Sequence, residues 1–418
     1  MPNTTKKKYS SDLLNILNER GFIHQTTNDR SIDDYFNSNE IIGYIGFDLT
    51  AESLHVGSLL QIMLLKWLQD FGHKPIVLLG GGTTLIGDPS GKDESRKILD
   101  IKNIANNQSG ILKVFKKFLN FDNEKIIIEN NSNWLTDLNY ITFLRDFGKH
   151  FTVNRMLSFD SVKLRLDREQ PLSFLEFNYM LFQAYDFWEL NRRHNCKLQL
   201  GGSDQWGNII NGIELIRRVD QTEAFAITTP LITTSSGSKM GKTSDGAIWL
   251  DEDLTNPHEF WQFWRNTDDR DVNRFLKLFT TLPLGEIQKL EELQGSELNE
   301  AKKILANEVT KNTHGGDIAD LVYKSALETY EKKIISENLP LYHLNRSDFV
   351  DNIGLLTLLV KVGFSKSNSD ARKSILNGAI KINDQTITDP SAELSTTEIN
   401  KLKLSFGKKK HLLLSLDS

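Results

Sequence analysis

Short apolar runs alternate with stretches of helical periodicity between residues 41 and 250. Apolar and β-branched runs predict five strands, at residues 41–47, 74–80, 125–130, 197–202 and 224–232. Apolar residues spaced three and four apart predict helices at 59–71, 173–193 and 203–219. Alternating strands and helices are typical of a parallel sheet with helices on both faces. We therefore predict an α/β fold here, with ligands bound beyond the carboxyl ends of the strands.

The pattern changes after residue 250. Helical periodicity dominates up to residue 338, and Gly315 with Gly316 marks the end of one helix. A short polar stretch with one proline then predicts a linker. The remaining residues contain two helical segments followed by the alternating IKINDQTIT, which predicts a small α+β domain. The expected parts are 1–250, 251–338, the linker 339–350, and 351–418.

Composition narrows the class of protein. A chain of 418 residues is too long for one hydrophobic core, and the net charge of −5 argues against a protein that coats nucleic acid uniformly. From Asp351 onward, however, ten basic residues against seven acidic ones give +3, which leaves −8 for the rest. A basic tail on an acidic body often marks an anionic partner. The run Lys408–Lys410 is either a solvated charge run or a phosphate contact.

The sequence also bears on compartment. A single cysteine, Cys196, excludes an intramolecular disulfide and fits a reducing, cytoplasmic compartment. No run approaches the eighteen or so apolar residues that a membrane helix needs, so no membrane association is expected. The basic N-terminus lacks the apolar region of a secretory signal. The histidines show no metal-binding spacing, and no structural metal is expected.

Two segments carry the strongest chemical signal, HVGS at 55–58 and KMGKT at 239–243. The first follows a predicted strand and opens a predicted helix, where orphan amides and the helix dipole favour a phosphate. His55 can donate to a phosphoryl oxygen, and Gly57 allows close approach to the backbone. The second places Lys239 and Lys242 around Gly241 in a polar loop. Two cations there suit a reaction in which negative charge builds up on phosphate.

Other polar residues are placed to join them. YIGFD, GGGTTLIGD and LGGSD each follow a predicted strand, so these turns converge on one crevice. Tyr179, Gln183 and Asp186 are spaced so that they share one face of a helix, among aromatic residues. Buried polar groups need partners, so this face is either a structural network or a ligand contact. Taken alone, GDPSG at 87–91 is an ordinary turn.

These motifs together resemble the bacterial-type tyrosyl-tRNA synthetases along nearly the whole chain. HVGS stands where class I synthetases carry HIGH, and KMGKT stands for KMSKS. YIGFDLTAESLHVG, GDPSGK, FNYMLFQAYDF and LQLGGSDQWGNI resemble the tyrosine enzymes specifically. GLLTLLVKVGFSKSNSDARKSILNGAIKIND resembles an S4-like RNA-binding module. The resemblance implies a Rossmann-like catalytic domain at 1–250, a helical anticodon-side domain at 251–338 and an S4-like RNA-binding domain at 351–418.

The resemblance also implies the reaction. Tyrosine attacks the α-phosphorus of ATP, which is expected as its Mg²⁺ complex, and leaves as tyrosyl-adenylate with release of pyrophosphate. The tyrosyl group then passes to the 3′-terminal ribose of tRNA(Tyr). No enzyme nucleophile is needed, because such transfer asks mainly for positioning and charge stabilisation. A homodimer is implied by resemblance alone.

Roles follow for individual residues. The residues expected to act on the phosphates are Thr50, His55, Lys92, Arg96, Lys239, Lys242 and Thr243. The tyrosine phenol is expected to bind Tyr44 and Asp186, the α-amino group Asp88, Tyr179 and Gln183, and the carboxylate is expected to lie near Gln205. The nucleotide is expected to contact Asp48, Gly57, Ser58, Gly202, Asp204 and Lys242.

The chain departs from the family pattern at two of these places. Ser58 replaces the second histidine of HIGH, which weakens but does not exclude adenosine binding. Gly241 replaces the first serine of KMSKS, which should loosen the loop while both lysines remain.

Three other functions stay open beside this one. An ATP-dependent nucleotidyltransferase that never binds RNA is disfavoured by the C-terminal module. A binding protein with an inactive synthetase fold is disfavoured by the intact His55, Lys239 and Lys242. A tryptophanyl enzyme would not be expected to present Tyr44 with Asp186. A bacterial cytoplasm fits best, and an organellar form with its leader removed stays open.

Overall fold

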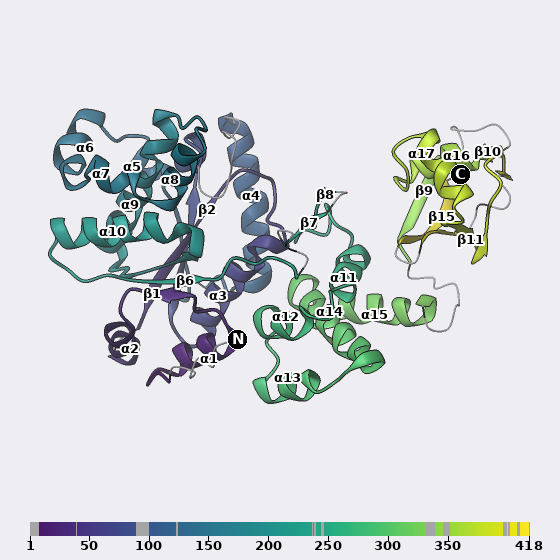
Figure 1. Ribbon diagram of the computed structural model, residues 1–418, viewed down its shortest axis with the longest axis horizontal. Coiled ribbons are helices and arrows are strands. Elements are labelled where there is room, and N and C mark those ends of the chain that lie inside the picture. Colours follow the sequence, from purple (N-terminus) through teal and green to yellow (C-terminus); the bar gives the residue numbers. More distant parts are fainter. Residues whose placement is uncertain are drawn as a thin grey trace. The chain divides into compact units, whose positions relative to one another are not determined.

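The computed structural model describes residues 8–38, 40–88, 100–122, 124–235, 237, 240–243, 246–330, 339–345, 352–395, 399, 402–407 and 410–417. The chain divides into two compact units (Figure 1). The first contains residues 1–251 and 268–293, and the second contains residues 252–267 and 294–418.

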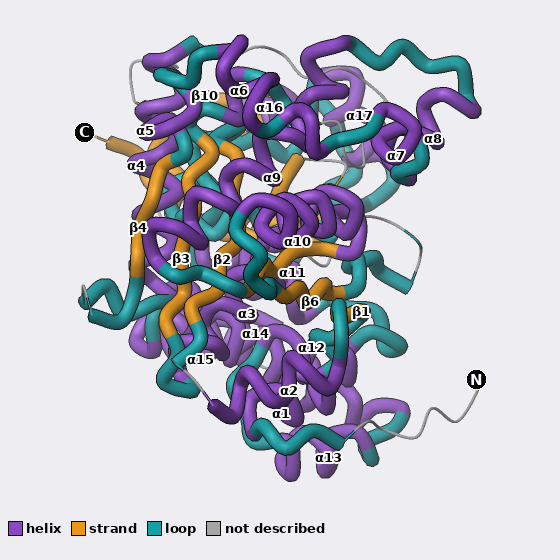
Figure 2. The backbone as a smooth tube through the Cα atoms, turned by 90° about the vertical axis from the view of Figure 1, so that its left-hand side faces the viewer, coloured by secondary structure: helices purple, strands orange, loops and turns teal. Residues whose placement is uncertain are grey.

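A six-stranded sheet forms the centre of the first unit. Its strands, in spatial order, are β1 (Gln25–Thr26), β6 (Phe225–Thr229), β5 (Leu198–Gly202), β2 (Ile42–Asp48), β3 (Lys74–Gly80) and β4 (Ile127–Asn130). The five predicted strands are confirmed and run parallel, whereas β1 adds an antiparallel edge with Gln25 opposite Thr228. Figure 2 shows β4, β3 and β2 side by side. Sequence patterning missed β1 because two polar residues make no apolar run.

Helices cover both faces of this sheet. Helices α9 (Phe174–His194) and α10 (Trp206–Val219) pack together on one face, and α3 (Leu59–Asp70) and α4 (Ile101–Phe118) lie on the other (Figure 1). The predicted helices correspond to α3, α9 and α10. A capping box starts α9, because the Ser173 hydroxyl accepts from the Glu176 amide while the Glu176 carboxylate accepts from the Ser173 amide.

Shorter helices complete the first unit. They are α1 (Asp12–Arg20), α2 (Asp29–Ser38), α5 (Ser132–Leu135), α6 (Tyr140–Asp146), α7 (Val153–Leu157), α8 (Asp160–Asp167), α12 (Val272–Phe279) and α13 (Leu284–Glu291). Helix α12 packs against α3 and α1. Residues 268–293 therefore fold with the sheet, although the sequence places them in a separate helical region.

The second unit contains a helical part and a sheet. Helices α11 (Pro257–Arg265), α14 (Leu298–His314) and α15 (Gly316–Tyr330) pack on one another around the buried Phe260 and Trp264. Helix α14 ends at His314 and is followed by Gly315, whose φ of 92° suits glycine. This agrees with the helix end predicted there.

The C-terminal sheet has the order β12 (Gln385–Thr386), β11 (Ile380–Ile382), β14 (Leu402–Phe406), β15 (Lys410–Asp417) and β9 (Leu341–Asn345). Two further strands, β10 (Asn352–Gly354) and β13 (Glu393–Ser395), pair with each other. Helices α16 (Leu355–Lys361) and α17 (Asn368–Leu376) contribute apolar side chains to the same core. The predicted IKINDQTIT hairpin is present as β11 and β12, turning at Asn383 and Asp384, which both have positive φ.

One expectation needs correction in this part of the chain. Residues 341–345, expected within the linker, form β9 and pair in parallel with β15, so that Leu341 lies opposite Leu413. The side chain of Leu344 is buried in the core of this sheet. Pairing with a strand about seventy residues later leaves no signal in the local pattern, which explains the error.

Candidate active site

A pocket of about 420 Å³ opens beyond the carboxyl ends of the parallel strands of the first unit. It gathers thirteen of the residues singled out from the sequence. They are Tyr44, Asp48, Thr50, His55, Gly57, Ser58, Asp88, Tyr179, Gln183, Asp186, Gly202, Asp204 and Gln205. These residues come from β2, the start of α3, α9, β5 and the turns between them, as expected for a parallel sheet.

The remaining five residues are not placed in this pocket. Lys92, Arg96 and Lys239 lie outside the described residues. The backbone of Lys242 and Thr243 forms β7 (Lys242–Thr243), which pairs with β8 (Gly246–Ala247), and their side chains lie outside the described part.

Asp186 forms the polar floor of the pocket. Its side chain is 2 % exposed, and each carboxylate oxygen accepts one hydrogen bond. Trp134 Nε1 donates to Oδ1 at 2.7 Å, and Asn131 Nδ2 donates to Oδ2 at 2.9 Å. Each oxygen keeps room for a further donor, because a carboxylate oxygen has two lone pairs. The site can therefore receive a hydroxyl from a ligand.

Burial gives this carboxyl unusual protonation behaviour. Desolvation raises the pKa of Asp186 to about 7, although the bonds from Asn131 and Trp134 act in the opposite direction. Burial also raises the pKa of the Tyr44 hydroxyl well above its usual value, so Tyr44 stays protonated. Among the described residues the Tyr44 hydroxyl is buried and has no hydrogen-bond partner. An unpaired buried hydroxyl beside a carboxylate is poised to bond a polar ligand group.

Asp48 is the last residue of β2, and it lies beside Tyr179 of α9. The Tyr179 hydroxyl donates to both Asp48 oxygens at 3.4 Å, and the Thr83 hydroxyl donates to Oδ1 at 3.0 Å. Asn131 also donates to the Thr83 hydroxyl at 3.0 Å. The carboxylates of Asp48 and Asp186 are thus joined through Thr83 and Asn131, which fixes the pocket wall between them.

An amide network forms the opposite part of the pocket. Asn208 Nδ2 donates to Gln183 Oε1 at 3.0 Å and to Gln205 Oε1 at 3.2 Å. Gln205 Nε2 in turn donates to Asp88 Oδ2 at 3.1 Å. Three residues expected to face the amino acid backbone therefore lie in one hydrogen-bonded chain.

The HVGS segment forms a turn of 3₁₀ helix that leads into α3. The Gly57 amide donates to His55 Nδ1 at 2.9 Å. Because Nδ1 accepts this bond, the proton of a neutral His55 ring is on Nε2, which can then donate to a ligand. Ser58 lines the pocket, and its hydroxyl does not cap α3.

The HVGS and KMGKT segments are in direct contact. The Val56 amide donates to Ile248 O at 2.9 Å, and the Ile248 amide donates to Gly241 O at 3.1 Å. Gly241 has a φ of 81°, and a Cβ there would lie 2.7 Å from Val56 Cγ2. A serine at this position would be strained and crowded. The glycine that departs from the family pattern therefore fits a close approach between the two segments.

Sequence reasoning missed four residues that hold this site. Asn131, Trp134 and Thr83 bond the two carboxylates, and Asn208 bonds the two glutamines. Asn131 directly follows β4, so the rule that ligands bind at the carboxyl ends of parallel strands could have found it. Trp134 lies on α5 and Asn208 inside α10, where their polar roles leave no pattern in the sequence.

The described residues show neither a metal cluster nor a membrane-spanning helix. No group of three or more His, Cys, Asp or Glu side chains in the described ranges is placed to hold a metal ion. In that same part of the chain, no helix is both long and apolar enough to cross a membrane.

The chain is similar to known proteins over nearly its full length. Residues 37–331 match the family model described as tRNA synthetases class I (W and Y). Residues 332–414 match a tyrosine–tRNA ligase SYY-like C-terminal domain. A tyrosine–tRNA ligase of Bartonella henselae is 56% identical over 411 residues, covering 97% of this chain and 99% of that protein.

Solved structures show the same relationship. The C-terminally truncated mitochondrial tyrosyl-tRNA synthetase of Aspergillus nidulans has a TM-score of 0.69 and 32% identity, covering 78% of this chain and 95% of that one. A tryptophanyl-tRNA synthetase from Giardia lamblia has a TM-score of 0.57 at 15% identity, covering 77% and 89%, which is a likeness of fold alone.

Proposed function

The chain belongs to the class I tRNA synthetases (W and Y), and from that premise we infer how its pocket carries out the reaction. It is an aminoacyl-tRNA synthetase with the tyrosine–tRNA ligase activity named for relatives that are 52% to 56% identical. Tyrosine is activated with ATP to tyrosyl-adenylate and pyrophosphate. The tyrosyl group is then transferred to the 3′-terminal ribose of tRNA(Tyr).

We propose that the floor of the pocket reads the tyrosine phenol. The phenol hydroxyl would donate to the Asp186 carboxylate and accept from the Tyr44 hydroxyl. The observation that carries this assignment is the pairing of a buried carboxylate, already fixed by Asn131 and Trp134, with a buried tyrosine hydroxyl that has no partner in the described structure. Phenylalanine would leave the Tyr44 hydroxyl without a partner and the Asp186 carboxylate with its two protein donors alone, and an unpaired buried polar group costs roughly 1–3 kcal/mol.

The α-amino group of tyrosine would bind between Asp88, Tyr179 and Gln183. A cation at this place is favoured by the nearby carboxylates of Asp88 and Asp48. Gln205, bonded to Asp88, would lie beside the tyrosine carboxylate. This orientation brings the attacking carboxylate toward the HVGS segment, where ATP is proposed to bind.

ATP would lie along the start of α3. His55 would donate from Nε2 to a phosphoryl oxygen, with Thr50 beside it, and Gly57 and Ser58 would contact the nucleotide. Asp48, Gly202 and Asp204 would accept hydrogen bonds from the ribose hydroxyls. ATP is expected as its Mg²⁺ complex, in which the cation offsets phosphate charge.

Lysine side chains would act on the transferring phosphates. Lys239, Lys242 and Thr243, with Lys92 and Arg96, would bind the pyrophosphate as negative charge develops on it. Their contribution is greatest in the transition state, so they would raise the rate of adenylate formation more than the affinity for tyrosine. The contact of Gly241 with Val56 and Gly57 supports this arrangement, because it places KMGKT against HVGS.

An exchange assay tests this assignment of the pocket. Amino-acid-dependent ATP–pyrophosphate exchange should occur with tyrosine and be far weaker with phenylalanine or tryptophan. The Tyr44→Phe variant should lose part of its preference for tyrosine over phenylalanine while remaining folded. Equal exchange with tryptophan and tyrosine in the parent protein would contradict the assignment of the phenol site.

We further propose that the region 351–418 binds tRNA. Its excess of positive charge and its match to the C-terminal domain of tyrosine–tRNA ligases support this role. Residues 251–338 would lie toward the anticodon. A cytoplasmic location is also proposed, since Cys196 is a free, buried thiol that suits a reducing compartment.

A homodimer is proposed from the exposed apolar side chains on α6, α7, α8 and α9. Nine of them lie on helices that cluster at one side of the first unit (Figure 1). They are Tyr140, Ile141, Leu144, Val153, Leu157, Leu164, Leu166, Phe174 and Leu175. An apolar surface of this kind usually marks an interface, and a second copy of the chain is the commonest partner. Sedimentation of the purified protein would measure its oligomeric state.

A further inference from the structure

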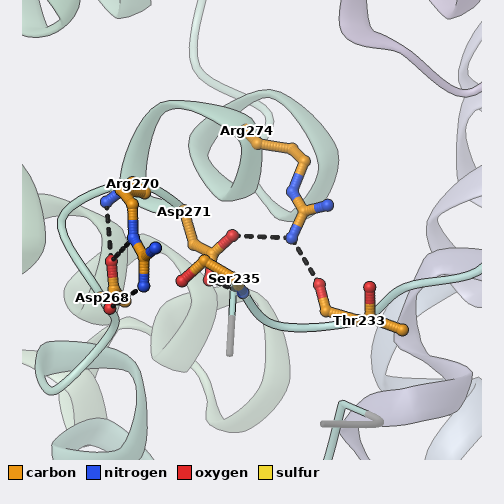
Figure 3. A network of polar contacts seen from close by, with 6 residues as sticks. All are labelled: Thr233, Ser235, Asp268, Arg270, Asp271 and Arg274. Carbon is orange, nitrogen blue, oxygen red and sulfur yellow. Dashed lines mark hydrogen bonds and ion pairs between the residues drawn. The ribbon is translucent and has the colours of Figure 1, made fainter. Parts of the chain in front are cut away.

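The residues at the start of α12 hold the segment that leads into KMGKT. Asp271 Oδ2 accepts from the Ser235 amide at 2.7 Å. Arg274 donates to Thr233 O and also pairs with Asp271 Oδ1 at 2.7 Å. Figure 3 shows the two side chains facing the Thr233–Ser235 backbone from α12.

The Asp271 carboxylate bonds the Ser235 amide and the Arg274 guanidinium, and it does not cap its own helix. It occupies the N-cap position of α12, where an aspartate normally accepts from an amide of the first turn. Its side chain makes no such bond here. Asp271 is 3 % exposed, and both of its carboxylate oxygens are used in binding Ser235 and Arg274. Hydrogen bonds to a buried carboxylate are strong and fix geometry, because water competes poorly for it.

The far end of α12 is also fixed. The guanidinium of Arg20, which is 3 % exposed, donates to the carbonyls of Lys277, Thr280 and Leu282. The same guanidinium lies 4.4 Å from the centre of the Trp67 ring on α3. Since α3 begins at HVGS, α12 is connected at one end to the HVGS helix and at the other to Thr233 and Ser235.

A backbone hydrogen bond joins the KMGKT segment to the residue that precedes Thr233. The Met240 amide donates to Ile232 O at 3.3 Å, immediately before Thr233. Gly241 then packs against Val56 and Gly57. Asp271 and Arg274 therefore bind the one stretch whose position sets how the chain enters KMGKT. Neither residue lines the pocket, so any effect on the reaction must pass through this stretch.

We propose that Asp271 and Arg274 are positioning residues for adenylate formation. They fix Thr233–Ser235 on α12, so that the following lysines are delivered to the phosphates with less loss of conformational freedom. This inference rests on the proposed role of Lys242, and it assigns no contact with substrate to α12.

Single variants give the first test. Arg274→Ala should slow single-turnover adenylate formation roughly 10- to 100-fold, the scale expected when a reacting group is misplaced by about 1 Å. The tyrosine dissociation constant should not change, because the pocket floor is untouched. Asp271→Asn, which keeps the size and one acceptor oxygen, should slow the reaction less. Arg217→Ala is the control, since Arg217 is an exposed arginine whose guanidinium bonds Glu214 on α10, away from the Thr233–Ser235 segment.

A double-mutant cycle separates positioning from general destabilisation. If α12 acts through the lysines, Arg274→Ala should add little to the rate loss already caused by Lys242→Ala. A normal rate in Lys242→Ala alone would overturn the proposed role of the lysine. A slow Lys242→Ala with a normal Arg274→Ala would overturn the present inference and leave that role intact. Rate losses that multiply, or a weakened tyrosine dissociation constant in Arg274→Ala, would also overturn it.

Discussion

The selectivity of the pocket depends at the residue scale on Asp186 and the two donors that fix it. Asn131 and Trp134 hold the carboxylate in one orientation, so it loses little freedom when a ligand binds. We expect Asp186→Ala to abolish the preference for tyrosine over phenylalanine, because the variant lacks the buried carboxylate that would accept from the phenol hydroxyl. Rejection of phenylalanine by roughly 10⁵ is already established for tyrosyl-tRNA synthetases, which are the reference example of this effect.

The measurement is the ratio of kcat/KM for the two amino acids in ATP–pyrophosphate exchange. Asp146→Ala offers a control, because Asp146 is an exposed carboxylate that bonds Arg145 on α6. An Asp186→Ala enzyme as selective as the parent would show that another group reads the phenol.

The raised pKa of Asp186 predicts a pH dependence of tyrosine binding. The carboxyl must be ionised to accept from both protein donors and the phenol, and its pKa is about 7 in the folded protein. Tyrosine affinity should therefore fall as the pH drops through 7, approaching roughly tenfold per pH unit well below it. Equilibrium binding on both sides of pH 7 measures this effect. Asp186→Asn should bind weakly and without this dependence, and a flat profile in the parent would contradict the assignment.

The pKa shift of Asp186 also makes the free energy of unfolding depend on pH, in the direction opposite to that of a carboxylate paired at the surface. The folded state holds the proton more tightly than the unfolded chain, in which an aspartate has a pKa of about 3.9. The contribution of Asp186 therefore favours folding at low pH and is lost as the pH rises from about 4 to about 7. Tyrosine binding would restore part of this free energy above pH 7.

At the scale of elements, α9 carries three of the residues proposed to bind tyrosine. Its capping box at Ser173 and Glu176 satisfies amides that the helix itself cannot pair. Ser173→Ala should lower the free energy of unfolding by about 1 kcal/mol. Tyr179, the first α9 residue proposed to bind tyrosine, lies almost two turns after Ser173. Tyrosine activation by the variant should therefore persist at temperatures where the protein is folded. Thermal unfolding and exchange measured on one preparation test both parts, and a loss of tyrosine affinity at low temperature would contradict the second.

The elements themselves were accessible from the sequence to different degrees. Strands β2 to β6 and helices α3, α9 and α10 carry apolar runs or helical periodicity, and these signals are local. Strands β1 and β9 are short or half-exposed and exist because they pair with strands far along the chain. The contact of α12 with Thr233 and Ser235 is likewise a product of the tertiary fold. Residues lining the pocket could be placed by motif, whereas the roles of Asn131, Trp134 and Asn208 depend on tertiary contacts that leave no motif.

At the scale of the whole molecule, the residues proposed for tyrosine activation and those proposed for tRNA binding lie in different parts of the chain. All residues proposed to bind tyrosine and ATP belong to the first unit. A chain ending after residue 331, where the synthetase family match ends, should keep tyrosine-dependent ATP–pyrophosphate exchange. This boundary also removes β9 together with its partner β15, so that no unpaired strand is left behind.

Transfer to tRNA should fall sharply in the truncated chain, since basic contacts with phosphate supply much of RNA affinity. In the full chain, tRNA binding should weaken more steeply with salt than in the truncated one. Charging of tRNA at low concentration and its salt dependence are the measurements. Unchanged charging would mean that residues 332–418 do not bind tRNA, and lost exchange would mean that they support the catalytic fold.

The bonds from Arg20 also limit how early some native contacts can form while the chain is being synthesised. Its acceptors lie 257 to 262 residues later, and β1 pairs with β6 about two hundred residues along the chain. At roughly 5–20 residues per second, translation from Arg20 to Leu282 takes about 13–50 s. During that time, the buried face of α1 has no α12 to pack against. Helix α1 can therefore pack against α3, made about forty residues after it, well before it reaches its contacts with α12.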